Sequence, residues 1–150
     1  MQTPAAAAPR PLFGVNGDIA RFESLTGQQQ TVGHLIVGWG QGALWGGRFA
    51  RLFTTMGDVP LLGFSTRTLG REAITPAQIA GGKGDAYLVA LNAAISEFGS
   101  QIYVRPMGEM NGYWNVYCAY TKEGRPKPGH STADFKKAFD ELNATTPALF

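Results

Sequence analysis

Short apolar runs alternate with amphipathic stretches along this chain. The apolar runs cover residues 12–15, 34–37, 59–64 and 101–105. Each run is followed by a stretch in which apolar residues recur every three or four positions, which places them on one face of a helix. These stripes comprise Ile19, Phe22 and Leu25; Trp45, Phe49, Leu52, Phe53 and Met56; Tyr87, Leu88, Leu91 and Ile95; and Phe135, Ala138, Phe139 and Leu142. The pattern predicts four strand–helix units in succession.

Helix start signals support this division. Thr75 precedes Pro76, and proline favours the first position of a helix. Ser131 is followed three residues later by Asp134, a spacing typical of a capping box. Asp18 opens the first helical stretch, and a longer helix is predicted over residues 85–98.

Strands that alternate with helices pair in parallel, so the predicted fold class is α/β. Two architectures contain four such units: the first half of a (β/α)₈ TIM barrel, and an open doubly wound sheet. The chain has 150 residues, whereas a complete barrel has about 250. In both architectures the chemistry lies at the carboxyl ends of the strands, here at residue 16, residues 38–41 and 65–67, and from residue 105 onward.

The composition is that of a globular domain, with 44% hydrophobic and 16% charged residues. The formal net charge is only +2 and the basic residues are scattered, so no footprint for nucleic acid or anionic lipid stands out. No apolar run has the length of a membrane span. Cys118 is the only cysteine, which excludes an intrachain disulfide and a multi-cysteine metal site. A neutral or weakly charged partner fits this chain best.

Residues 1–11 are rich in alanine and proline and lack the basic start and apolar core of a secretory signal. We expect either a flexible leader or the tail that remains after a signal peptide, which leaves the compartment open and an extracellular location as one alternative. Residues 12–150 contain no linker and are predicted to form one domain.

The segment after the fourth apolar run contains several residues of the types that bind ligands or catalyse reactions. It reads YVRPMGEMNGYWNVYCAY and brings together Arg105, Glu109, Asn111, Tyr113 and Trp114 at the functional end of the predicted sheet. Glycoside cleavage needs a carboxylic acid that protonates the leaving oxygen, and aromatic faces stack on sugar rings. Glu109 is the candidate acid, and the neighbouring aromatic residues are the candidate platform.

This segment resembles glycoside hydrolase family 26, the family of β-mannanases and related β-glucanases, whose fourth-strand motif runs approximately R-P-x-H-E-M-N-G-x-W. The resemblance implies a retaining hydrolase of β-linked polysaccharide, with Glu109 as general acid/base. It also implies that Arg105 supports the site and that Asn111, Tyr113 and Trp114 shape the sugar pocket. Neither the resemblance nor the residues point to a metal or cofactor.

Two departures from the family pattern matter. The histidine that precedes the acid/base in the family is Gly108 here. The family's nucleophile is a glutamate on the seventh strand, and the sequence reaches Phe150 just after its fourth predicted helix. We therefore expect the first half of a barrel, which is either part of a longer chain or pairs with a second copy through its exposed edges.

Other functions remain open. A non-catalytic carbohydrate-binding domain or pseudoenzyme would also lack the family histidine and the nucleophile. Residues 38–43, GWGQGA, formally fit a dinucleotide-binding turn, and Arg67 could contact the 2′-phosphate of NADP. Trp39 suits either sugar stacking, the role we predict for it, or core packing. His34 is predicted to be structural at the opposite end of its strand, and neither His130 nor Cys118 is predicted to act chemically.

Overall fold

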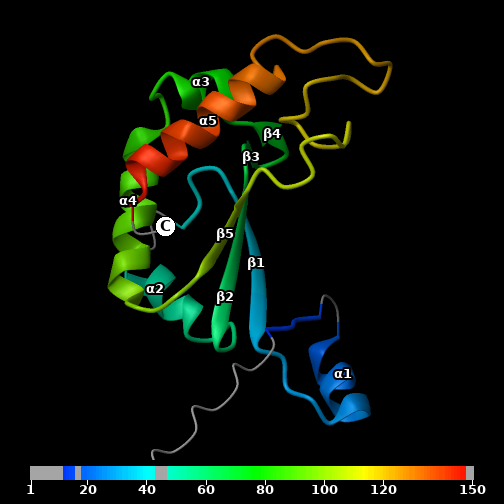
Figure 1. The fold of residues 1–150 in the computed structure, drawn as a ribbon, viewed down its shortest axis with the longest axis vertical. Coiled ribbons are helices and arrows are strands. Elements are labelled where there is room, and N and C mark those ends of the chain that lie inside the picture. Colours follow the sequence, from blue (N-terminus) through cyan, green and yellow to red (C-terminus); the bar gives the residue numbers. More distant parts are fainter. Residues whose placement is uncertain (1–11, 16–17, 43–46, 148–150) are drawn as a thin grey trace, which may run out of the picture.

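The computed structural model describes residues 12–15, 18–42 and 47–147, so the predicted leader, residue 16 and Trp45 lie outside the described residues. A parallel sheet contains β1 (Val32–Gly38), β2 (Val59–Ser65) and β5 (Tyr103–Pro106), in the order β1-β2-β5 (Figure 1). A small antiparallel hairpin, β3 (Arg67–Thr68) and β4 (Arg71–Glu72), follows β2. The predicted α/β class with a parallel sheet is confirmed.

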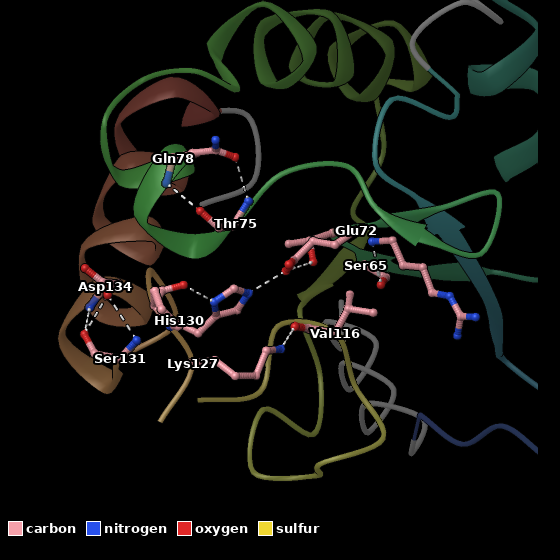
Figure 2. Close-up of polar contacts among 12 residues, drawn as sticks. Ser65, Glu72, Thr75, Gln78, Val116, Lys127, His130, Ser131 and Asp134 are labelled. Atoms are coloured by element: carbon pink, nitrogen blue, oxygen red, sulfur yellow. Dashed lines mark hydrogen bonds and ion pairs between the residues drawn. The ribbon is translucent and has the colours of Figure 1, made fainter. Parts of the chain in front are cut away.

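Five helices accompany these strands in the described part of the chain: α1 (Ile19–Thr26), α2 (Gly47–Phe53), α3 (Pro76–Ala80), α4 (Asp85–Phe98) and α5 (Thr132–Thr145). The predicted starts are confirmed. Thr75 and Gln78 form one capping box, and Ser131 and Asp134 form another (Figure 2). The Asp18 side chain accepts a hydrogen bond from Arg21 N at the start of α1. No helix among the described residues is long and apolar enough to cross a membrane.

One face of the sheet packs on the helices. Leu62 and Phe64 of β2 meet Leu88 and Leu91 of α4 in the core, together with Phe53 of α2. The predicted stripe on α4 is confirmed, since Tyr87, Leu88, Leu91 and Ile95 are all buried. In Figure 1, α2 and α4 lie on one side of the sheet, while α1 lies apart from them near the start of β1.

The opposite face of the sheet is partly open. Side chains alternate between the two faces of a strand, and the exposed set on β1 is His34 and Ile36. Ile36 is 65% exposed, and Tyr103 on β5 is 42% exposed. This face therefore has no helix packed across it in the described part of the chain, and it leads directly to the carboxyl ends of the strands.

The prediction of a strand at residues 12–15 was wrong. Phe13 O does accept hydrogen bonds from Thr31 N and Val32 N, at 2.9 and 3.1 Å. Phe13 N, however, donates to the Thr31 hydroxyl rather than to a backbone carbonyl, which stops a ladder from forming. A Cβ added at Gly14 would lie 2.5 Å from Val32 O, so glycine permits this close approach. The segment lies against the start of β1 without joining the sheet.

Candidate functional site

The chain leaves β5 through a strained turn. Met107 N donates to Phe64 O at 2.8 Å, which extends the pairing of β5 with β2. Met107 and Glu109 then adopt φ angles of 48° and 59°, in the left-handed region that residues other than glycine rarely occupy. Such strain persists where the surroundings hold it and is concentrated at functional sites. The turn carries Glu109 beyond the carboxyl end of the sheet.

Side chains from the following loop hold the backbone of this turn. The Tyr117 hydroxyl donates to Gly108 O at 2.5 Å, and Asn115 Nδ2 donates to Glu109 O at 2.9 Å. Gly112 N also donates to Glu109 O, at 2.9 Å. Burial raises the pKa of Tyr117, and the negative charge of Glu109 raises it further, while Arg105 lowers it. The net upward shift in pKa keeps this hydroxyl protonated, so it remains a donor.

Both oxygens of the Glu109 carboxylate have a partner, yet the group stays accessible. Arg105 Nη2 lies 3.8 Å from Oε1, and Trp114 Nε1 donates to Oε2 at 3.2 Å. The Arg105 and Glu109 side chains are 49% and 57% exposed. An ion pair this exposed contributes about 0–1 kcal/mol to stability. Its main effect is to orient the carboxylate while leaving it open to a ligand.

Gly108 makes room for Arg105. A Cβ added at Gly108 would lie 2.5 Å from Arg105 Nε and 2.7 Å from its Cζ, closer than real side chains approach. The guanidinium therefore occupies the space that a side chain at position 108 would need. The absence of a side chain at position 108 is thus coupled to the placement of Arg105 beside Glu109.

A pocket of about 280 Å³ opens between this turn and the open face of the sheet. Its walls come from three strands, the hairpin and the long loop, and its lining residues are His34, Ile36, Gly63, Phe64, Ser65, Arg67, Arg105, Gly108, Glu109, Asn115 and Tyr117. Glu109 is the only carboxylate in this lining. Two of the predicted site residues, Arg105 and Glu109, are thus brought together here.

The remaining residues of the motif lie on the surface beside the pocket. Trp114 is 63% exposed and Tyr113 is 54% exposed, and their rings meet edge to face with centroids 5.4 Å apart. A Cβ at Gly112 would lie 2.4 Å from Trp114 Cε2, so glycine lets this ring lie close to the backbone. Asn111 is exposed next to them. Trp114 is joined to the site through Glu109, and the other two flank it.

Trp39 is not brought into this pocket. Its ring centroid lies 4.9 Å from that of Tyr87 and 6.0 Å from that of Phe64, and the side chain packs against the core. A Cβ at Gly84 would lie 2.5 Å from Trp39 Cζ2, which shows how closely α4 approaches the ring. Of the two roles considered for Trp39, core packing is the one for which the structure provides contacts. Cys118 is buried and free, as expected of a small packing residue.

The position expected for His34 was wrong. Because β1 begins at Val32 rather than at residue 34, His34 lies within the strand on its open face and lines the pocket. Ser65 and Arg67 belong to residues 65–67, which were predicted to lie at the functional end of the sheet. Asn115 and Tyr117 were not predicted as site residues. The period of two along a strand places His34 and Ile36 on one face. The sequence of β1, VGHLIVG, has a single polar side chain, so no alternation of polar and apolar residues marks that face.

A buried histidine ties the long loop to the hairpin. His130 is 4% exposed, and its Nε2 lies 2.7 Å from Glu72 Oε1 while its Nδ1 lies 2.7 Å from Pro128 O. Figure 2 shows the Glu72 and His130 side chains pointing toward each other, with Lys127 bonded to the carbonyl oxygen of Val116 nearby. Glu72 therefore has a structural partner, and this contact fixes the hairpin that follows β2.

Backbone amides of the glycine-rich segment after β1 donate hydrogen bonds to acceptors within the protein. Gly38 N donates to Gln41 Oε1 at 2.7 Å, and Trp39 N donates to Arg67 O at 3.3 Å. Gln41 N in turn donates to Gly38 O. These three amides do not point at a common anion as the amides of a dinucleotide-binding turn do.

Neither protein-family models nor curated proteins give a match to this chain. Within residues 12–15, 18–42 and 47–147, no three histidine, cysteine or acidic side chains are grouped as metal ligands would be.

Proposed function

We propose that this chain forms the first half of a (β/α)₈-barrel glycoside hydrolase that cleaves a β-linked, mannan-like polysaccharide with retention, and that Glu109 is its general acid/base. The observation that carries the proposal is the position of the Glu109 carboxylate. It projects from the carboxyl end of a parallel sheet, is accessible, and touches an exposed tryptophan. That combination suits proton transfer to a glycosidic oxygen while a sugar ring stacks on the aromatic surface.

The winding of the sheet is compatible with the proposed barrel. β1, β2 and β5 lie side by side in chain order, each parallel to the next. A barrel adds successive strands in one direction, as each half of a doubly wound sheet also does on its side of the switch point. Residues 12–15 lie beside the start of β1, where a preceding unit of a barrel would approach.

A retaining glycosidase needs a second carboxyl group about 5–5.5 Å from the first. The described residues that line the pocket supply only Glu109. We infer that the nucleophile comes from outside this pocket, as the resemblance implies for a glutamate on a seventh strand. The open face of the sheet, which bears Ile36 and Tyr103, is the surface across which the other half of a barrel would pack.

A second candidate is a non-catalytic carbohydrate-binding domain. It is favoured by a specific observation: Arg105 pairs with Glu109 and fills the space of the family histidine at Gly108. In this alternative the carboxylate accepts hydrogen bonds from sugar hydroxyls instead of donating a proton. The exposed rings of Tyr113 and Trp114 serve both candidates equally.

The two candidates are separated by titrating the chain with β-1,4-mannohexaose and assaying the release of reducing ends. We expect the chain to bind the hexamer and Trp114→Ala to weaken that binding. When the half of the barrel that carries the nucleophile is also present, we expect hydrolysis that Glu109→Gln lowers by about 10²–10⁴-fold. Glu123→Gln, an exposed loop variant, is the matched control and should change neither quantity. Binding without turnover when that half is present, unchanged in Glu109→Gln, would favour the binding domain. Absence of any saccharide binding would overturn both proposals.

A further inference from the structure

The pocket beside Glu109 carries more positive than negative formal charge. Arg67 and Arg105 contribute two positive charges to its lining, and Glu109 contributes one negative charge, which leaves a net formal charge of +1. A pocket built for a neutral sugar needs no such excess, because hydroxyl groups are recognised by neutral donors and acceptors as well as by charged ones. The excess points to an anionic ligand group.

Arg67 is free to bind that group. Its partner across the hairpin is Glu72, and opposite charges at such positions commonly pair. Glu72 instead directs its carboxylate to the buried His130 at 2.7 Å (Figure 2). Arg67 therefore has no acidic partner among the described residues, and the side chain is exposed at the rim of the pocket.

The backbone positions Arg67 firmly although its side chain is free. Arg67 N donates to Ser65 Oγ at 3.0 Å, and Arg67 O accepts from Trp39 N at 3.3 Å. Thr68 Oγ1 donates to Trp39 O at 2.5 Å. A Cβ at Gly38 would lie 2.3 Å from Arg67 O, so glycine at the end of β1 permits this contact. The hairpin thus fixes the backbone of Arg67 at the carboxyl end of the sheet.

Arg105 retains donors of its own. Its Nη2 lies 3.8 Å from Glu109 Oε1, which is an ion-pair distance but longer than a hydrogen bond. A guanidinium presents five N–H donors in a planar fork that matches the two oxygens of a carboxylate.

We propose that this pocket is a subsite for a carboxylated sugar, so that the polysaccharide recognised by this chain contains β-linked uronate residues, with Arg67 binding the carboxylate of the sugar. This inference rests on the proposed function and narrows its substrate class. Arg67 acts here as a specificity-determining residue, and Glu109 keeps its role in proton transfer. Carboxylate recognition by arginine is strengthened by charge-assisted, two-point hydrogen bonding.

The test compares two ligands that differ only at C6: β-1,4-mannohexaose and its oxidised counterpart, the β-1,4-linked hexamer of mannuronate. Affinities of the full chain for both are measured at low and high salt. We expect the uronate hexamer to bind about tenfold more tightly at low salt, and this preference to shrink as salt screens the charge. Arg67→Gln should bring the two affinities close to parity, and Arg67→Lys, which keeps the charge but loses the fork, should retain part of the preference.

Arg71→Gln is the matched control, because Arg71 lies on the same hairpin, is exposed and is outside the pocket lining. It removes the same net charge, so a preference that depends only on net charge would fall equally in Arg71→Gln and Arg67→Gln. That result, or equal binding of the two hexamers by the unmodified chain, would overturn the uronate subsite while leaving the proposed function intact. Failure of the chain to bind either hexamer would instead overturn the proposed function.

Discussion

Replacing Tyr117 by phenylalanine tests how the turn that carries Glu109 is held. The ring is 5% exposed, so phenylalanine keeps its packing and removes only the hydroxyl that donates to Gly108 O at 2.5 Å. Loss of one hydrogen bond costs about 0.5–1.5 kcal/mol, and a carbonyl left buried without a partner costs about 1–3 kcal/mol. Because Asn115 Nδ2 lies 3.5 Å from the same oxygen, we expect the free energy of unfolding to fall by about 1 kcal/mol.

The same variant should change the dependence of stability on alkaline pH. The pKa of Tyr117 is raised in the folded state, chiefly by burial, so above about pH 10 the unfolded chain releases a proton that the folded chain retains. The stabilisation linked to Tyr117 is complete below that pH and is lost as the pH rises through the raised pKa. The difference in the free energy of unfolding between the unmodified chain and Tyr117→Phe should therefore become smaller at alkaline pH.

Urea denaturation at several pH values between about 7 and 11 measures both effects. Tyr87→Phe is the matched control, since burial also raises the pKa of Tyr87 and its hydroxyl donates to Gln41 O at 2.9 Å. Both variants should lose stability, but only Tyr117→Phe should weaken saccharide binding beside Glu109. Equal stability of Tyr117→Phe and the unmodified chain at neutral pH, or a stability gap that stays constant as the pH rises, would refute the reasoning.

Two further predictions concern the fold. In Gly33→Ala, the new Cβ would lie 1.5 Å from Met56 O, a backbone atom that can move only at a high energetic cost. We therefore expect the free energy of unfolding, measured by urea denaturation, to fall by at least about 3 kcal/mol. Gly81→Ala, whose Cβ would meet nothing closer than 3.5 Å, is the control and should fold normally. In Asp134→Asn, the acid dependence of stability should weaken. Hydrogen bonds from Ser131 lower the pKa of Asp134, so its contribution is present above about pH 4 and is lost as the pH falls through the lowered pKa. Melting temperatures of both proteins that run parallel across the acid range would contradict this.

Local signals predicted the parts of the fold that depend on neighbours in sequence. The helix start at Thr75 follows from the proline that comes next, and the capping box at Ser131 follows from Asp134 three positions on. The helix predicted over residues 85–98 matches α4 (Asp85–Phe98), because its apolar stripe and the glycine that follows it agree on where it ends. The strand expected at residues 12–15 failed because its pairing depends on the Thr31 hydroxyl, which no local pattern reports.

Only the site residues that lie close together in one sequence motif could be predicted. Glu109 and Arg105 belong to one motif, and the structure pairs them. Arg67 approaches the same pocket from a hairpin whose strands have two residues each, too short for a periodic signal. The turn of this hairpin places Leu69 at a φ of 50°, a conformation that favours glycine or asparagine. A leucine at that position gives no sequence signal for a turn. Such proximity depends on the fold as a whole.

The contact between Gly108 and Arg105 also limits how this protein can diverge. Any side chain introduced at position 108 must displace the guanidinium, and loss of the arginine removes the ion-pair partner of Glu109. The two positions therefore form an epistatic pair, in which the effect of one substitution depends on the residue at the other. Among descendants of this sequence, a histidine at 108 is expected to arise together with, or after, a change at 105.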